Sequence, residues 1–256
     1  MLKKQTLITI FTMLMAFNAN ALVLLNLEET TPYIKKIGVE GKYTFAQDKH
    51  DDFIFIYNKS REVTYIKHKN LAKTYKIAYS KLNNSKFMTN LKAETSKLEL
   101  AGYNSNLFTI KFAGRNCFQV YGSKDLGDAV SNGVSSVYAI YKTFVYMTGQ
   151  MQPNKKCEEV TISKSFDDKV GFPLALFYQG KQVKVESVEN SEDNMQKYLN
   201  DLNVDMKKAV QPDLDLQYEL MYSLLSEKQQ ETFNQSSKNK PVGVKIRAID
   251  NLLKGF

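Results

Sequence analysis

Residues 53–77, FIFIYNKSREVTYIKHKNLAKTYKI, decide the fold class. Three short runs rich in β-branched and aromatic residues are separated by two polar turns, NKSR and KNLA. Val63 and Tyr65 share one face of an extended chain, because successive side chains of a strand point to opposite sides. The stretch predicts strand, turn, strand, turn, strand, which is typical of an antiparallel meander.

The pattern of strands continues in both directions. Upstream, GVEGKYTFAQ is expected to form one half-buried strand with Val39 and Tyr43 on the same face, followed by a turn at 48–52. The strands expected downstream are LFTIKF (107–112), NCFQVYG (116–122), CEEVTISKSF (157–166), VGFPLALFYQ (170–179) and QVKVESVEN (182–190), the last two as a hairpin. Such a sheet has an apolar face that other elements must cover.

Helices are expected to provide that cover. A weak helical pattern spans residues 84–98, and a stronger one, with apolar residues three or four apart, spans 125–151. In the C-terminal third, Ser191 is expected to cap a helix that continues to Pro212. Asp213 is expected to begin the next helix. Residues 235–241 are expected to be a flexible link, and the type of the last element stays open between strand and helix.

The N-terminus has the pattern of a secretory signal peptide. Lys3 and Lys4 precede an apolar run over 7–17, and Ala19-Asn20-Ala21 is a small-x-small cleavage site. The run is shorter than the ~20 residues that a membrane-spanning helix needs, which argues against an uncleaved anchor. Residue 22 is Leu, so cleavage leaves no cysteine for a lipid anchor. We therefore expect a periplasmic or secreted protein.

Export changes the interpretation of the two cysteines. Cys117 and Cys157 flank the strong helical pattern and would lie in an oxidising compartment, where such a pair usually forms a disulfide. A redox pair is the alternative, but it favours C-x-x-C spacing, which this sequence lacks. We expect a structural cross-link between the sheet and the base of the helix.

The charge balance argues against a nucleic-acid partner. The 35 Lys and Arg outnumber the 27 Asp and Glu, which gives a net charge of +8, but only three of these cations are arginines. Arginine is the preferred side chain for phosphate and guanine recognition, and the lysines are interleaved with acids. A basic exterior of this kind fits weak attraction to anionic lipid or polysaccharide, with at most peripheral membrane contact.

Few residues have the pattern of a catalytic or metal site. Asp48, His50 and Asp52 would share one face of a strand and could hold a divalent ion, but these residue types are also ordinary in hairpin turns. His68 is expected to be a surface side chain at a strand end. The sequence GVSSV (133–137) lacks the second glycine of a nucleophile elbow. The chain is therefore expected not to be an enzyme and to need no cofactor.

Three stretches carry a family resemblance. The meander of residues 53–77 follows the signal peptide, GRNCFQVY (114–121) ends a strand, and GFPL (171–174) begins a later one. Over about residues 35–190 the chain resembles uncharacterised bacterial periplasmic proteins with the lipoprotein-carrier (LolA-like) fold. The resemblance implies an α+β protein in which a strongly bent antiparallel sheet, a half-barrel, wraps around helices, and a concave apolar face can hold acyl chains.

The expected domains are a signal peptide at 1–21, a half-barrel at 22–190, as the resemblance implies, and a helical extension at 191–256, in which the chain departs from the lipoprotein carriers. The side chains expected to line the concave face are Tyr43, Phe45, Phe55, Tyr65, Tyr75, Phe112 and Leu176.

Three functions remain open. An unfilled cavity favours a carrier of a lipid or acyl chain, whereas a cavity plugged by the protein's own side chains favours an interaction protein with an envelope or host partner. A polar cleft with converging carboxylates favours an undetected hydrolase.

Overall fold

The computed structural model describes residues 22–28, 33–82, 90–112, 114–149, 165–178 and 181–254. Within these ranges the chain is an α+β protein with a large antiparallel sheet that is not closed, which confirms the class expected from the sequence. The strand order is β6-β5-β4-β3-β2-β1-β11-β10-β9-β8-β7. The first strand, β1, therefore pairs with the last strand, β11, in the middle of the sheet. The expected signal peptide lies outside the described residues.

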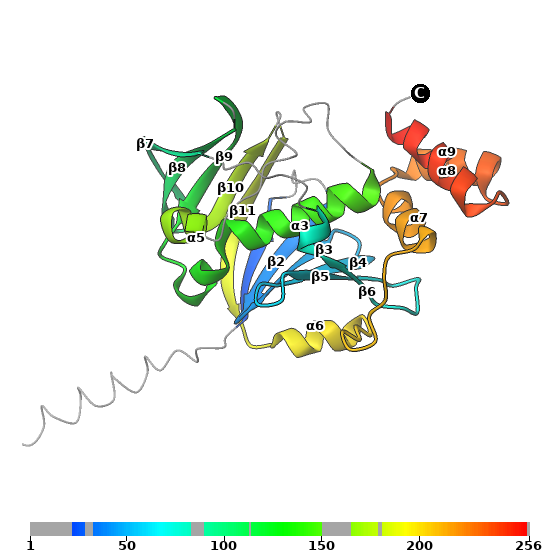
Figure 1. The fold of residues 1–256 in the computed structure, drawn as a ribbon, viewed down its shortest axis with the longest axis horizontal. Helices are drawn as coiled ribbons and strands as arrows, with labels where there is room; N and C mark the ends of the chain where they lie inside the picture. The colour runs from blue at the N-terminus through cyan, green and yellow to red at the C-terminus, as the bar shows by residue number, and fades with distance from the viewer. Residues whose placement is uncertain are drawn as a thin grey trace, which may run out of the picture.

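The strands are β1 (Leu22–Leu27), β2 (Ile34–Glu40), β3 (Tyr43–Asp48), β4 (Phe53–Asn58), β5 (Val63–His68), β6 (Tyr75–Ala78), β7 (Asn90–Leu100), β8 (Tyr103–Phe112), β9 (Arg115–Ser123), β10 (Phe172–Tyr178) and β11 (Lys181–Ser191). The helices are α2 (Tyr79–Leu82), η1 (Gly127–Asn132, a 3₁₀ helix), α3 (Gly133–Thr148), α5 (Ser165–Val170), α6 (Met195–Asp201), α7 (Leu214–Tyr222), α8 (Glu227–Ser237) and α9 (Val242–Lys254). In Figure 1, α3 crosses one face of β2–β5 and α6 lies on the opposite side, while β7–β9 and α7–α9 occupy opposite ends of the molecule.

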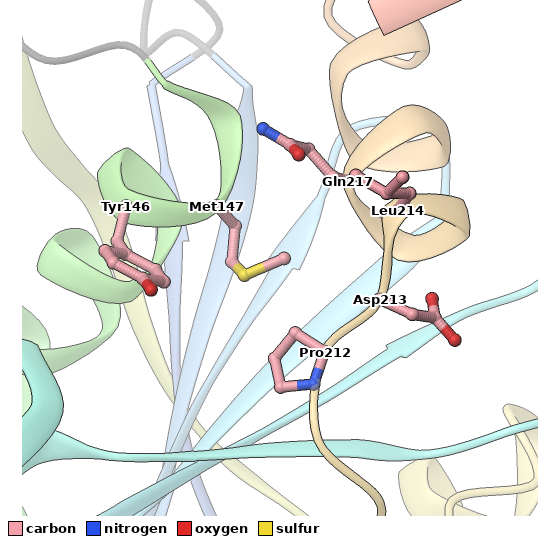
Figure 2. Close-up of a pocket in the computed structure, with 6 residues that line it drawn as sticks. All are labelled: Tyr146, Met147, Pro212, Asp213, Leu214 and Gln217. Atoms are coloured by element: carbon pink, nitrogen blue, oxygen red, sulfur yellow. The ribbon is translucent and has the colours of Figure 1, made fainter. Parts of the chain in front are cut away.

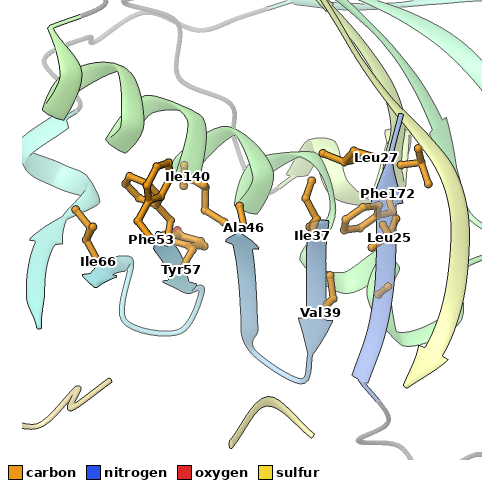
Figure 3. Close-up of a cluster of buried hydrophobic side chains, with 14 of the residues drawn as sticks. Leu25, Leu27, Ile37, Val39, Ala46, Phe53, Tyr57, Ile66, Ile140 and Phe172 are labelled. Carbon is orange, nitrogen blue, oxygen red and sulfur yellow. The ribbon is translucent and has the colours of Figure 1, made fainter. Parts of the chain in front are cut away.

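The main hydrophobic core lies between the sheet and α3 (Figure 3). Phe53, Phe55 and Ile66 are at most 1% exposed, and Ile140 of α3 packs against the same cluster. Phe144 of α3 meets Phe55 edge to face with ring centroids 5.9 Å apart. Full burial of each large apolar side chain stabilises the fold by about 1.5–3 kcal/mol, so this layer holds α3 firmly on the sheet.

The opposite face of the sheet has a smaller core of its own. Phe45, Ile54 and Tyr65 are buried there beneath Met195 of α6 and Ala209 of the segment that follows it. Both faces of β3–β5 are therefore covered, which explains why β4 reads as a continuous apolar run and not as an alternating one.

The meander is confirmed, with one correction near its start. Residues 38–47 are not one strand, because Gly41 and Lys42 form a two-residue turn between β2 and β3, in which Gly41 has φ of +54°. Glycine adopts this left-handed conformation without a Cβ clash. The turn places Val39 in the core under α3 and Tyr43 on the opposite face.

The helix expected over 84–98 is wrong for its described part. Residues from Asn90 onward form the edge strand β7, which pairs with β8 through a turn at Ala101 and Gly102, both with positive φ. A two-residue turn of this kind joins antiparallel strands tightly, and strand pairing overrode the weak helical spacing. Likewise, α5 occupies the end of the strand expected over 157–166, whose other residues lie outside the described ranges.

The strong helical pattern is confirmed in part. The α-helix begins at Gly133 and not at residue 125, and the residues directly before it form the 3₁₀ helix η1. The hairpin expected between the last two strands is confirmed, because Tyr178 pairs with Lys181.

The C-terminal third contains more, shorter helices than expected. Asn194, and not Ser191, caps α6, which ends at Asp201 because Asn203 adopts a positive φ of 53° soon after it. The helix expected to continue to Pro212 is therefore wrong, whereas Asp213 caps α7 as predicted. The link expected at 235–241 is also shorter, since α8 continues to Ser237 and a helix, α9, ends the described chain.

Candidate functional site

The seven side chains expected to line one concave surface lie on different surfaces. Tyr43, Phe45 and Tyr65 pack beneath α6, whereas Phe55 and Tyr75 pack beneath α3. Leu176 borders a third cluster, formed with β8 and β9, and the side chain of Phe112 lies outside the described residues. The single-surface arrangement is therefore wrong, because the strand register places Phe55 opposite Ala46, the neighbour of Phe45, so Phe55 and Phe45 point to opposite faces.

Large apolar side chains pack beneath α3, and among the described residues a groove lies between the end of α3 and the start of α7 (Figure 2). This edge groove has a volume of about 330 Å³, and its lining residues are Tyr146, Met147, Pro212, Asp213, Leu214 and Gln217. The first two come from the C-terminal end of α3 and the others from the start of α7. Tyr146 is 50% exposed and Leu214 is 56% exposed, so both present apolar surface to solvent.

The carboxylate in the edge groove is already fully engaged. Asp213 accepts hydrogen bonds from the backbone N–H of Leu216 at 3.0 Å, the Tyr75 hydroxyl at 3.3 Å and the Lys73 ammonium at 3.4 Å. Burial acts to raise the pKa of Asp213, but these donors outweigh it and hold the pKa below its usual value. Burial and the charge of Asp213 raise the pKa of Tyr75 to about 12. Asp213 is therefore a fixed anion that shapes the start of α7 and not a proton donor.

The acidic turn proves to be held by local bonds. Asp48 is buried and accepts from the backbone N–H groups of Phe53 at 2.8 Å and His50 at 3.1 Å. Burial raises the pKa of Asp48 despite these bonds. Asp52 pairs with Lys69 across the neighbouring turn. Within the described ranges, no three His, Cys, Asp or Glu side chains are grouped closely enough to hold a metal ion.

A second pocket, of about 270 Å³, lies beside this turn. The turn joining β3 and β4 forms one side, and the residues between α7 and α8 form the other. Its lining includes Asp48, Phe53 and Leu225. The Asp48 carboxylate is already hydrogen-bonded within its own turn. Two of its apolar lining side chains, Phe53 and Leu225, are buried.

His68 is buried, and the expectation of a surface side chain is wrong. It is 2% exposed and stacks on Phe53 with ring centroids 6.4 Å apart. Its Nδ1 accepts from the backbone N–H of Asn70 at 3.2 Å, and Glu219 of α7 lies 3.8 Å from the same nitrogen. Burial lowers the pKa of His68, although Glu219 and Asp52 oppose the shift. His68 is therefore a neutral packing residue between β5 and α7.

The two serines of GVSSV are buried in the first turn of α3. The backbone N–H of Ser135 donates to Asp167 of α5 at 2.8 Å, and its hydroxyl donates to the same carboxylate. Lys59 forms an ion pair with Asp167 at 2.8 Å. Asp167, which is distant in the sequence, thus caps α3. A cap is needed because the first N–H groups of a helix otherwise lack partners. Ser135 is therefore a structural residue.

The expected disulfide stays a prediction. Cys117 is buried on β9, as a cross-linking residue of the sheet requires. Cys157 lies outside the described residues.

Comparison with protein-family models found no family that matches this chain, and comparison with curated proteins found no match. Among solved structures, the chain resembles PNGF-II in its C2 crystal form with a TM-score of 0.46 and 11% identity, over 78% of this chain and 33% of PNGF-II. The P21 form gives a TM-score of 0.45 and 10% identity, over 79% and 34% of the two chains. This chain spans about a third of the length of the matched chains, and the likeness is too distant to assign a fold family or a function.

Proposed function

We propose that this chain is an exported, non-enzymatic interaction protein of the bacterial envelope. In this proposal the open sheet is a half-barrel of the lipoprotein-carrier type, and α3 fills it permanently. The observation that supports this reading is the packing beneath α3, where Phe53, Phe55 and Ile66 are almost fully excluded from solvent. A concavity filled by the protein's own side chains leaves no room there for an acyl chain.

Export is supported by the N-terminal sequence, with its lysines, apolar run and small-x-small site. The described helices include none with the length and apolar character needed to cross a bilayer.

The edge groove is the proposed contact point for an envelope partner. Tyr146 and Leu214 flank it and are half exposed, and an aromatic side chain beside a small apolar depression is typical of the residues that dominate protein–protein affinity. The Asp213 carboxylate already accepts bonds from the Tyr75 hydroxyl and the Lys73 ammonium. The partner is therefore expected to insert an apolar side chain between the end of α3 and the start of α7.

A lipid-like ligand is the second candidate, favoured by the size of the same groove. Small-molecule sites have volumes of roughly 300–1,000 Å³ and mainly apolar walls, and the edge groove reaches the lower end of that range at about 330 Å³. In this alternative, an acyl chain would lie against Met147 and Leu214.

Titration with a fluorescent fatty acid separates the two candidates. The interaction proposal predicts no saturable binding to the wild-type protein, because the groove is short and half open. The carrier alternative predicts saturable binding that Leu214→Asp weakens at least ~10-fold, since a charge would replace apolar contact. Leu98→Asp is the matched control, because Leu98 is 46% exposed on β7 at the other end of the molecule. Saturable wild-type binding that only Leu214→Asp removes would reject the interaction proposal.

A further inference from the structure

The C-terminal extension separates its charges sharply along the chain. Residues 191–231 contain four Lys and nine Asp or Glu, a net charge of −5, whereas residues 232–254 contain five Lys or Arg and only Asp250, a net charge of +4. Another basic stretch occurs at residues 63–93, which contain seven lysines and no Asp or Glu. The last two helices with their connecting turn, residues 227–254, contain six Lys or Arg and three Asp or Glu, so this end of the molecule has a net charge of +3.

This basic end is a small helical unit with its own core. Phe233 of α8 and Ile249 of α9 are fully buried against residues of α7, and these contacts involve no strand of the sheet. Figure 1 shows α8 and α9 at the end of the molecule opposite β7. Because the unit contributes little to the cores on the sheet, its outward surface is free to serve another purpose.

Cations gather on the outward surface of this unit. Lys238 and Lys240 lie in the turn between α8 and α9, and Arg247 lies on α9; all three are exposed and have no ion-pair partner within the described ranges. Among the other cations of residues 232–254, Lys254 pairs with Asp250 at 2.6 Å and Lys245 lies over an aromatic ring of α7.

Apolar surface lies among these cations. Val244 is 38% exposed and is one helical turn before Arg247, so both occupy the same side of α9. Pro241 is exposed at the start of the helix. These cations and the valine among them form a surface that we call the basic tip: Lys238, Lys240, Val244 and Arg247.

We propose that the basic tip docks onto the surface of an anionic lipid bilayer. Cations near such a surface attract it electrostatically, and an apolar side chain among them can enter the boundary between headgroups and acyl chains. A soluble polyanion would use the cations but would gain little from an exposed valine. The acidic segment 191–231 would be repelled, which would orient the molecule with the basic tip towards the membrane. The inference does not depend on a partner at the edge groove.

Vesicle co-sedimentation tests this inference. The chain beginning at Leu22 contains every described residue, and it is mixed with phosphatidylglycerol–phosphatidylethanolamine vesicles or with phosphatidylcholine vesicles. Binding is expected only to the anionic vesicles and should weaken as salt is added. Each cation near the surface contributes about fivefold in partitioning, so the triple variant Lys238→Gln, Lys240→Gln, Arg247→Gln should bind about 100-fold more weakly.

The matched control removes three exposed cations from the other end of the molecule: Lys97→Gln, Lys124→Gln, Lys169→Gln. This variant has the same net charge as the first and should retain binding within about threefold of the wild type. Equal loss in both triple variants would overturn the proposal in favour of nonspecific attraction.

The apolar contribution is tested with Val244→Ser. This variant should bind vesicles several-fold more weakly and should bind heparin, a soluble polyanion, as the wild type does. An unchanged affinity for vesicles would indicate a soluble polyanion as the partner and would also overturn the proposal.

Discussion

A chain that ends at Asn190 is expected to lose cooperative folding altogether. Met195 and Ala209 cover one face of the sheet, and Leu216 and Leu220 of α7 enter the core on the other; all four are at most 6% exposed. Removing a single buried Leu or Met side chain costs about 2–5 kcal/mol, and whole domains are stable by only about 5–15 kcal/mol. Urea unfolding followed by circular dichroism should therefore show no cooperative transition for residues 22–190.

A chain that ends at Ser226 is the control for this truncation. It retains α6 and α7 and loses only α8 and α9, whose buried side chains pack mainly against α7. It should unfold cooperatively, with a midpoint below that of the full chain. If residues 22–190 unfold cooperatively, the domain boundary expected from the sequence is correct and the extension is an addition to a self-sufficient sheet domain.

Replacing Asp167 with Ala is expected to destabilise the protein by about 3–5 kcal/mol. The carboxylate is 3% exposed, caps the first turn of α3 through Ser135 and balances the charge of Lys59, which is itself only 20% exposed. The substitution removes the carboxylate that balances the partly buried Lys59 ammonium, which keeps its bond to the Ser131 carbonyl oxygen, and it leaves an N–H group of α3 unsatisfied. Because α3 covers the main core, the loss should appear as a lower midpoint of urea unfolding.

The adjacent Asp168 provides the matched control. It is exposed on the same short helix, so Asp168→Ala removes the same functional group with an expected effect within about 0.5 kcal/mol. Ser135→Ala should have an intermediate effect of about 1 kcal/mol, since the backbone N–H bond to Asp167 remains. Equal stabilities of the Asp167 and Asp168 variants would show that α3 is not held by this cap.

The sequence predicted the sheet well because its strands carry local signals. The runs at 53–58 and 63–68 are β-branched and aromatic, and their turns contain Asn, Ser and Lys. The face of each strand was harder to predict, because it depends on the pairing register, which places Phe55 opposite Ala46 and not opposite Phe45. The lining residues were therefore divided between two faces that pattern alone could not separate.

The functional surfaces depend on contacts that are distant in sequence. Asp167 contacts Lys59 and Ser135, and the edge groove brings Tyr146 together with Leu214, so no local spacing reports either arrangement. One local signal was available for α5, since Ser165 precedes Asp168 by three residues, the spacing of a helix N-terminus. The charge separation in the extension was also present in the sequence. That the basic residues lie at one end of the molecule could be seen only from the positions of α8 and α9.

Site-specific photocrosslinking in the native envelope tests the central claim most directly. A photoreactive amino acid is placed at Leu214 in the edge groove and, in a separate chain, at the matched exposed position Leu98 on β7. The interaction proposal predicts one discrete protein adduct from position 214, with none from position 98. No protein adduct from position 214, or the same adduct from both positions, would contradict the account.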